Sequence, residues 1–469
     1  MKYPLLIILA LSLAIHIPFA FSWHEIWWDS GVYIGMGKNI YSAGENGLWE
    51  HIRPPLVPLI LGLFWKIGLD PVLFGRLFEI ALMLGIVWLT YQLALKWFGE
   101  KTAIIASLIV ALSPILYYLS FHQYTEIPST FLVLLALWLF TKEKYLWAGI
   151  ATGTAFLAKF PAGIFIAMLL FTLAINKKWK NFWQAGAGFA VIVIPYFLWS
   201  WTIYGNPLAT FTAAQDTISR ALGCNVLRHK PWWQYFSWLA FSETKLHFLA
   251  IIGIFALWKR WKKEYLLFAL CLALPAMYFM QLNCRDYRYL ALFLPFAAIL
   301  TALGVTFVYD KFNFKKKWVF TALVIILGVW MLNTTIQYYY GNELQQPDIT
   351  AEKYYGYISD KEITGEIWIS NPIVAAHTDK KLEKIYYPIF NSGISGDFTE
   401  YIKLNSDQIG AVMLDNCGGG IICPPEDKNC PIKIQELIQE LDTKFTRIMD
   451  ETTGNCWYRI WTTSATSTQ

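Results

Sequence analysis

The sequence predicts a polytopic α-helical membrane protein that ends in a small extracytoplasmic α/β domain. Of the 469 residues, 56% are hydrophobic and only 15% are charged, and the mean hydropathy is +0.40. A soluble domain usually has about a quarter of its residues charged, so a soluble multi-domain enzyme is excluded. Intrinsic disorder is excluded too, because 23 Trp, 26 Tyr and 32 Phe side chains need an apolar environment.

The distribution of charge divides the chain near residue 340. Residues 1–339 contain 27 Lys and Arg against 14 Asp and Glu, whereas residues 340–469 contain 11 against 19. The second part also lacks an apolar run of about 20 residues, the length that a helix needs to cross a bilayer. We therefore predict a transmembrane domain at 1–339 and a soluble domain at 340–469, a usual size for a domain.

Apolar segments in the first part predict about eleven transmembrane helices. The first, at 2–22, is interpreted as an uncleaved helix because no small-residue cleavage site precedes Trp23. The others lie at approximately 73–95, 102–119, 127–141, 145–158, 161–176, 182–203, 245–258, 265–282, 288–309 and 318–337. The apolar segment 54–68 is too short to span, so we expect it to lie in the outer interface, within a first outer loop at 23–72.

Basic residues predict the orientation of these helices. Together with Lys2, short alternate connections hold 16 of the 27 basic residues of the first part. These connections lie at 96–101, 142–144, 177–180, 259–263 and 311–317. Because short cytoplasmic loops are rich in Lys and Arg, we predict a cytoplasmic N-terminus and a multi-pass protein of the cell membrane. An odd number of spans then puts the C-terminal domain outside the cytoplasm, and no nucleic-acid partner is expected.

The soluble part is predicted to be a disulfide-bonded α/β module. Strands are expected at 366–370, 411–416 and 455–461, with an amphipathic helix at 432–443. Its four cysteines are Cys417, Cys423, Cys430 and Cys456. An even number in a loop-rich, non-cytosolic segment favours two disulfides, and the gaps of five and six residues fit a zinc site poorly. We expect this domain to cover the active site or to recruit the acceptor.

Seven charged residues are predicted at the outer membrane surface. They are Asp29, Arg53, Glu126, Lys159, Arg285, Asp286 and Arg288. Charges beside membrane spans are costly, which makes them candidates for function. Carboxylates together with cations are the groups needed to activate a hydroxyl and to neutralise a phosphate leaving group.

Three of these residues also have a purely structural interpretation. Asp29 could cap a helix at about 30–41, and Glu126 could cap the next span with Pro128 in its first turn. Lys159 stands at a helix end, where a lysine can extend to the lipid interface. Their joint position at one face is the observation that favours a functional site.

The order of five short motifs resembles the GT-C superfamily of membrane glycosyltransferases, in particular the protein O-mannosyltransferase and aminoarabinose transferase (ArnT-like) group. The motifs are Trp28-Asp29-Ser30-Gly31-Val32-Tyr33, Arg53-Pro54-Pro55-Leu56, Glu126, Leu157-Ala158-Lys159, and Arg288-Tyr289-Leu290 with Pro295. The resemblance covers residues 1–310 and extends to the soluble domain only by its position. Ser30 departs from the second acidic residue of the family's first motif, and Arg53 replaces a histidine, although His51 lies two residues away.

The resemblance implies a role for each motif residue. Asp29 would be the catalytic base, and Glu126 would position the acceptor or a metal. The phosphate of the lipid donor would be held by Arg53, Lys159 and Arg288, with His51, Tyr33 and Arg285 as additional candidates. A divalent metal is left open, with Asp29, Glu126 and His122 as candidate ligands, and no other cofactor is implied.

The function implied is transfer of a sugar from a polyprenyl (dolichyl)-phosphate donor to a hydroxyl of a protein, lipid or glycan. Asp29 would act as the general base, and attack opposite the phosphate would invert the anomeric centre. The alternative is a secondary transporter or lipid flippase. Transporters place ionisable residues near the bilayer midplane and often contain repeated halves, whereas here the charges gather at one surface and no repeat is found.

Overall fold

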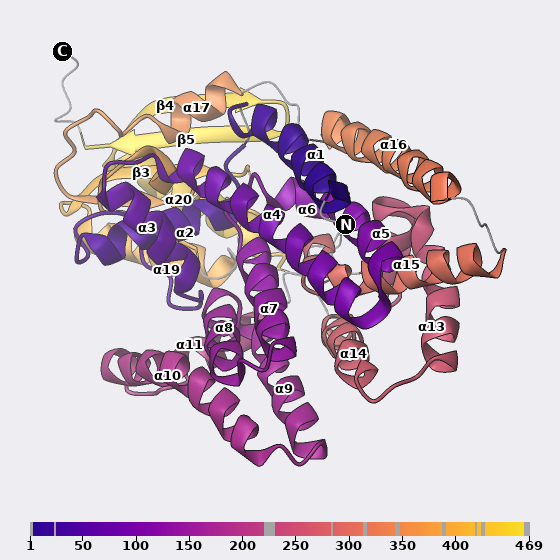
Figure 1. The fold of residues 1–469 in the computed structure, drawn as a ribbon. Coiled ribbons are helices and arrows are strands. Elements are labelled where there is room, and N and C mark those ends of the chain that lie inside the picture. Colours follow the sequence, from indigo (N-terminus) through magenta and orange to yellow (C-terminus); the bar gives the residue numbers. More distant parts are fainter. Residues whose placement is uncertain are drawn as a thin grey trace.

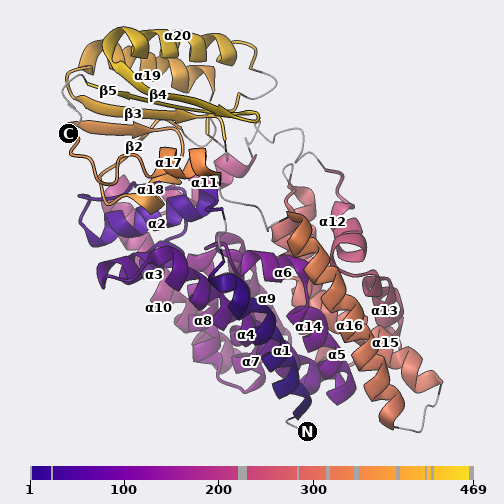
Figure 2. The same cartoon turned by 90° about the horizontal axis from the view of Figure 1, so that it is seen from above.

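The protein consists of a bundle of apolar helices and an α/β unit packed against one end of it (Figures 1 and 2). The computed structural model describes residues 3–22, 25–219, 230–282, 285–312, 317–342, 348–386, 391–417, 420–423 and 427–463. Helix α1 (Tyr3–Ala20) begins at the end of the bundle that is farthest from the sheet (Figure 2). The basic residues Lys2, Lys315 and Lys316 of the predicted cytoplasmic side lie outside the described residues.

Each predicted span coincides with helical structure. The helices of the bundle are α1, α4 (Pro71–Phe98), α5 (Glu100–Ala111), α6 (Pro114–Leu119), α7 (Glu126–Thr141), α8 (Tyr145–Ala158), α9 (Ile164–Ile175), α10 (Trp179–Tyr204), α13 (Ala250–Lys259), α14 (Tyr265–Gln281), α15 (Leu294–Lys311) and α16 (Lys317–Asn342). Within the described ranges, five of them are long and apolar enough to cross a membrane: α1, α4, α10, α15 and α16. The others are shorter, so the number of eleven spans stays a prediction.

Several predicted spans are interrupted. The span expected at 102–119 divides into α5 and α6, because Pro114 disfavours helical geometry at Ser113. The Ser113 hydroxyl then caps α6 by accepting from the Leu116 amide at 3.3 Å. Two further helices begin with a 3₁₀ turn, η1 (Phe160–Gly163) before α9 and η5 (Tyr287–Leu292) before α15. Both turns adjoin charged residues singled out in the sequence.

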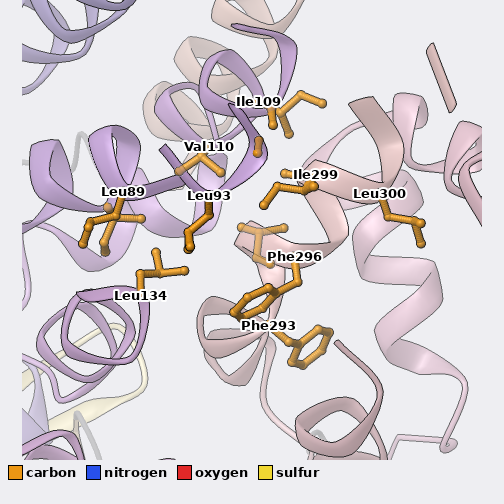
Figure 3. Packing of buried hydrophobic residues seen from close by; sticks show 14 of the residues in the cluster. Leu89, Leu93, Ile109, Val110, Leu134, Phe293, Phe296, Ile299 and Leu300 are labelled. Carbon is orange, nitrogen blue, oxygen red and sulfur yellow. The ribbon is translucent and has the colours of Figure 1, made fainter. Parts of the chain in front are cut away.

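The core of the bundle lies between α4, α5, α7 and α15. Figure 3 shows side chains of these helices pointing toward one another. They include Leu89 and Leu93 of α4, Ile109 and Val110 of α5, Leu134 of α7, and Phe296 and Ile299 of α15. Dense packing of this kind, together with small residues at helix crossings, holds membrane helices together where apolar burial from water is absent.

Glycines allow two pairs of helices to approach closely. A Cβ atom added at Gly149 of α8 would lie 2.0 Å from the Ala185 carbonyl oxygen of α10. A Cβ at Gly304 of α15 would lie 2.0 Å from the carbonyl oxygen of Leu249, just before α13. Larger side chains at these positions would separate the helices.

The α/β unit, which we call the outer unit after the side of the membrane on which it is predicted to lie, is built on a five-stranded mixed sheet. Its strand order is β2-β1-β3-β5-β4. The strands are β1 (Glu366–Ile369), β2 (Glu383–Lys384), β3 (Ile409–Asp415), β4 (Thr446–Thr453) and β5 (Cys456–Thr462). β1 pairs in parallel with β2 and β3, whereas β5 pairs antiparallel with β3 and β4. The three strands and the helix predicted from the sequence correspond to β1, β3, β5 and α20 (Cys430–Lys444).

Helices cover both faces of the sheet (Figure 2). One face packs against α19 (Ser392–Asn405) and α20, with Ile402 and Leu437 in that cluster. The other face packs against α17 (Ile349–Tyr355), α18 (Val374–His377) and α2 (Trp28–Tyr41). Alternate residues of β3 serve the two clusters, since Val412 faces α19 and α20 while Met413 faces α2.

Helix α2, from the segment predicted as the first outer loop, packs as part of the outer unit. Val32 and Met36 of α2 lie in one apolar cluster with Ile369 and Met413 of the sheet. A Cβ atom at Gly31 would lie 2.6 Å from the Pro372 carbonyl oxygen, so α2 lies directly on that backbone. The sequence-based boundary near residue 340 describes chain order, whereas the outer unit combines segments from both sides of it.

The helix expected at 54–68 is α3 (Leu56–Lys66). It crosses α2 where Gly37 faces Gly62, and a Cβ at Gly37 would lie 2.6 Å from the Gly62 amide nitrogen.

The two predicted disulfides are present in the outer unit, where Cys417 pairs with Cys456 and Cys423 pairs with Cys430. The first of these disulfides joins the segment after β3 to the start of β5.

Candidate active site

Five charged residues predicted from separate motifs meet where the helical bundle joins the outer unit. Asp29 lies in the first turn of α2, and Arg53 lies in the loop between α2 and α3. Glu126 is the first residue of α7, Lys159 follows the end of α8, and Arg288 belongs to η5. Each residue thus stands at or beside the end of a helix, where its side chain can leave the apolar bundle.

Asp29 lies between two arginines. Its Oδ1 atom is 2.8 Å from Arg53 Nη1, and its Oδ2 atom accepts a hydrogen bond from Arg288 Nη1. Asp29 does not cap α2, because the N-cap position belongs to Trp27 and has no side-chain cap. The capping interpretation of Asp29 is therefore wrong, and its carboxylate is used to hold two guanidinium groups.

Glu126 continues the same network on its other side. Its Oε1 atom accepts a hydrogen bond from Lys159 Nζ at 2.8 Å and lies 3.7 Å from Arg288 Nε. Its Oε2 atom accepts from the Thr125 hydroxyl at 3.3 Å. Arg288 thereby links the two carboxylates, and it also lies 3.5 Å from Asp286. Positive and negative groups alternate throughout the cluster.

Aromatic rings lie beneath the three cations. The Arg288 guanidinium is 5.2 Å from the ring centre of Tyr124, and Lys159 Nζ is 5.1 Å from that of Tyr289. The Arg53 guanidinium lies 5.6 Å from the ring of Tyr33, the residue expected as an additional contributor. Burial raises the pKa of Tyr33, so this phenol stays neutral beside the cations. Cation–π contacts of this kind orient the cations and exclude water from one side.

The cluster has hydrogen-bonding capacity left for an anion. Among the described residues, the buried Nε atoms of Arg53 and Arg288 have no hydrogen-bond partner. Two guanidinium groups and one ammonium group are the donors that suit a phosphate, since arginine can form parallel hydrogen bonds to two phosphate oxygens. The arrangement can therefore bind a phosphate while two carboxylates remain adjacent to it.

Arg285, expected as a further phosphate ligand, is used elsewhere. Its Nε and Nη2 atoms donate to the Met280 carbonyl oxygen at 3.0 and 2.6 Å, and its Nη1 atom donates to that of Lys230 at 2.5 Å. The side chain thus satisfies one backbone oxygen in the last turn of α14 and one at Lys230. The expectation for Arg285 is corrected, because its guanidinium is bound to backbone rather than offered to a ligand.

The three candidate metal ligands are not assembled into a metal site. His122 packs among aromatic rings, and its ring centre lies 4.5 Å from that of Tyr118 and 5.7 Å from that of Trp27. Burial, with a smaller contribution from Arg76, lowers its pKa to about 3. Asp29 and Glu126 each face cations, and no described group of three or more His, Cys, Asp or Glu side chains is arranged to bind a metal. This set of donors fits an anion better than a divalent cation.

Three residues near the cluster were not predicted from the sequence. Glu50 is 1% exposed and lies 3.7 Å from Arg53 Nε. Its position three residues before the Arg-Pro-Pro motif is the sequence feature that indicates a place near the site. Lys384 and Tyr386 come from the outer unit, and nothing in the local sequence indicates that they approach Arg53. His51, an expected contributor, packs against the Tyr204 ring with ring centres 5.8 Å apart. Burial, together with the charge of Lys384, lowers its pKa.

The fold, a bundle of apolar helices joined to an α/β unit, is similar to that of solved structures of ArnT and of the oligosaccharyltransferase AglB. ArnT from Cupriavidus metallidurans, solved bound to undecaprenyl phosphate, matches with a TM-score of 0.65 and 11% identity, over 98% of each chain. The oligosaccharyltransferase AglB from Archaeoglobus fulgidus, solved with an inhibitory peptide and a dolichol-phosphate, matches with a TM-score of 0.61 and 15% identity, over 88% of this chain and 69% of AglB.

The sequence itself matches a known family over part of its length. The family model for dolichyl-phosphate-mannose-protein mannosyltransferases matches residues 52–201, a stretch that contains Arg53, Glu126 and Lys159. An uncharacterized protein of Aquifex aeolicus is 33% identical over 156 residues, which is 30% of this chain and 31% of that relative. The chain is a multi-pass membrane protein that resembles the GT-C glycosyltransferases of the mannosyltransferase and ArnT group.

Proposed function

We propose that this protein transfers a sugar from a polyprenyl-phosphate donor to a hydroxyl acceptor at the outer face of the membrane. The observation that carries the proposal is the position of Asp29 between Arg53 and Arg288. In this arrangement the Asp29 carboxylate is paired with two guanidinium groups, which are suited to bind a phosphate. The structural relatives solved with undecaprenyl phosphate and dolichol-phosphate support a lipid-phosphate ligand for a fold of this kind.

Binding of the donor would then change the state of Asp29. A carboxylate paired with two guanidinium groups is a weak base, because both cations favour its charged form. A donor phosphate would compete with Asp29 for Arg53 and Arg288, since phosphate forms stronger and more numerous hydrogen bonds with arginine. The released carboxylate would be a stronger base, so donor binding would activate the group that the next step needs.

The chemical step can be written with these groups alone. Asp29 accepts the proton of the acceptor hydroxyl as its oxygen forms a bond to the anomeric carbon. The bond from that carbon to the phosphate oxygen breaks, and its electron pair leaves with the lipid phosphate. Arg53, Lys159 and Arg288 stabilise the negative charge that develops on this phosphate. Attack from the face opposite the phosphate inverts the anomeric centre.

The position of the cluster also favours a transferase over a transporter or flippase. A transporter needs charged groups near the bilayer midplane, reached in turn from both sides. Here Asp29 lies on α2 and Arg53 in the segment that follows it. Figure 2 shows α2 next to the α/β unit rather than midway along the bundle. A lipid-linked donor would present its phosphate at this level while its tail stays in the bilayer.

Sugar transfer from a defined polyprenyl-phosphate donor by purified Asp29→Asn protein tests the proposal. We expect kcat to fall by about 10²- to 10⁴-fold, the usual contribution of a general base. Binding of bare undecaprenyl phosphate is expected to be retained or strengthened, because asparagine competes less well for Arg53 and Arg288. The measurements are initial rates and equilibrium binding on the same preparation.

The matched control is Asp379→Asn. Asp379 is also an outer carboxylate, paired with Lys38 at 2.8 Å, but it lies outside the cluster. Its variant should retain wild-type turnover. Full activity of Asp29→Asn would remove Asp29 from the role of base, and loss of lipid-phosphate binding in that variant would contradict the competition between carboxylate and phosphate.

A further inference from the structure

The outer unit brings two polar side chains to the Arg53 side of the cluster. They lie on β2 and just after it, at Lys384 and Tyr386. The Tyr386 ring contacts the ring of Trp28 with centres 4.4 Å apart, and Trp28 is the residue before Asp29. Lys384 Nζ lies 5.7 Å from the same Tyr386 ring. A segment more than 300 residues away in sequence thereby forms one wall beside the predicted base.

Three buried polar atoms in this region have no hydrogen-bond partner in the part of the chain that the structure describes. They are the Tyr386 hydroxyl, Glu50 Oε2 and Arg53 Nε. The last two form an ion pair at 3.7 Å, a distance too long for a hydrogen bond. The first can donate and accept, the second only accepts, and the third only donates. Tyr386 is 2% exposed and Glu50 is 1% exposed, so bulk water does not reach them freely. Buried polar groups are normally satisfied, which indicates that a ligand completes these bonds.

The mixture of donors and acceptors restricts the chemistry of that ligand. A phosphate only accepts hydrogen bonds from such groups, and its negative charge would be repelled by the Glu50 carboxylate. A sugar hydroxyl both donates and accepts, so several hydroxyls can satisfy a carboxylate, a phenol and a guanidinium together. The partly exposed Trp28 ring adds an apolar surface suited to the C–H groups of a sugar ring.

We propose that Glu50 and Tyr386, supported by Lys384 and Trp28, form the subsite for the sugar of the lipid-linked donor. This inference rests on the proposed function, because it uses the phosphate position at Arg53 to assign the sugar to the donor. Lys384 interacts electrostatically with both Glu50 and Arg53, which places its charge on this side of the site. The outer unit would thus select the donor sugar as well as cover the centre.

A comparison of two ligands separates the sugar subsite from the phosphate site. Affinities are measured for bare undecaprenyl phosphate and dolichyl phosphate, and for undecaprenyl phosphate aminoarabinose and dolichyl phosphate mannose. The quantity of interest is the preference, the ratio of the affinity for a sugar-linked lipid to that for its bare lipid. Wild type should prefer at least one sugar-linked lipid, and Tyr386→Phe should lower that preference about fivefold, as expected for one hydrogen bond.

The preference is insensitive to a loss of folded protein, because that loss affects both ligands equally. Tyr401→Phe is the matched control, since Tyr401 is in the same unit but donates to Glu366 at 2.7 Å, and it should keep the wild-type preference. An unchanged preference in Tyr386→Phe, or no preference in wild type, would overturn the subsite. Failure of wild type to bind the bare lipids would instead overturn the proposed function.

Discussion

The charges of the site are stable beside a membrane because each is paired. Isolated charges at this depth would be costly, but Asp29 holds Arg53 and Arg288, and Glu126 holds Lys159. These pairs fix the positions of the cations before a donor arrives. The donor groups are therefore already oriented when a phosphate binds, which lowers the entropic cost of binding.

This arrangement predicts that removal of either Arg53 or Lys159 weakens donor binding. Arg53→Ala and Lys159→Ala should each raise the donor KM by about 10- to 100-fold, as expected for loss of a charge-assisted hydrogen bond. Affinity for bare undecaprenyl phosphate should fall by a similar factor. Lys66→Ala is the control, because Lys66 is exposed at the end of α3 in the same outer loop and makes no contact with the cluster. A donor KM unchanged by Arg53→Ala would remove Arg53 from the phosphate site.

At the level of elements, the site depends on where helices stop and on how closely they pack. Glu126 begins α7, Lys159 directly follows α8, and Arg288 lies in the 3₁₀ turn before α15. The turn is held by Glu243, whose carboxylate accepts from the Tyr287 hydroxyl and, at 2.6 Å, from that of Ser113. A buried carboxylate thus joins η5 to α6 next to Arg288.

Close packing of α2 on the outer unit predicts a strong effect of a single methyl group. In Gly31→Ala the added Cβ would lie 2.6 Å from the Pro372 carbonyl oxygen, a distance that forces α2 away from that backbone. We expect destabilisation of about 1–3 kcal/mol, the usual cost of overpacking, and reduced turnover because α2 carries Asp29. Thermal unfolding and initial rates would measure the two effects.

The matched control for this variant is Gly396→Ala in α19. A Cβ at Gly396 has no heavy atom within 4 Å, so alanine should be tolerated there and should stabilise the helix slightly. Equal melting temperatures for Gly31→Ala and wild type would show that α2 can move without cost. The assignment of α2 to the outer unit would then be weakened.

On the scale of the whole molecule, the outer unit is assembled around a buried polar network as well as two apolar clusters. Asp415, at the end of β3, accepts hydrogen bonds from Ser370 Oγ at 2.8 Å, Asn371 Nδ2 at 2.9 Å and the Tyr355 hydroxyl at 3.0 Å. The network joins α17, β1 and β3 on the face that receives α2. It therefore stabilises the face of the outer unit against which α2, the helix that carries Asp29, packs.

This network predicts a pH dependence of stability. Burial raises the pKa of Asp415 from 3.8 to about 6, although its hydrogen bonds oppose the shift. Between these values the folded protein retains a proton that the unfolded chain has lost, so the contribution of Asp415 to stability decreases as pH rises from about 4 to 6. A shift of this size corresponds to about 3 kcal/mol.

Chemical denaturation followed by tryptophan fluorescence, at several pH values between 4 and 7, would measure this contribution. Asp415→Asn removes the titration, so the free energy of unfolding of wild type minus that of the variant should decrease across this interval. Above pH 7 the difference should be constant. A difference independent of pH from 4 to 7 would mean that Asp415 titrates alike in the folded and unfolded states.

Much of the architecture is determined by local sequence. Runs of apolar residues predict the helices of the bundle. Short strand-like segments predict β1, β3 and β5, and an amphipathic helical pattern predicts α20, because all these signals depend on nearby residues. The five charged residues at helix ends could be selected for the same reason, since an ionisable residue beside an apolar run is conspicuous. The resemblance to GT-C enzymes follows from the order of these motifs.

Which residues meet is decided by the tertiary structure. Asp29 and Arg288 are 259 residues apart. Apart from the motif resemblance, nothing local distinguishes Arg288, which binds Asp29, from Arg285, which binds backbone carbonyls. The packing of α2 against the sheet and the approach of Tyr386 to Trp28 likewise depend on apolar surfaces that form only when distant segments pack together. Apolar patterns and charges are properties of short segments, whereas ion pairs and substrate contacts are set by long-range packing.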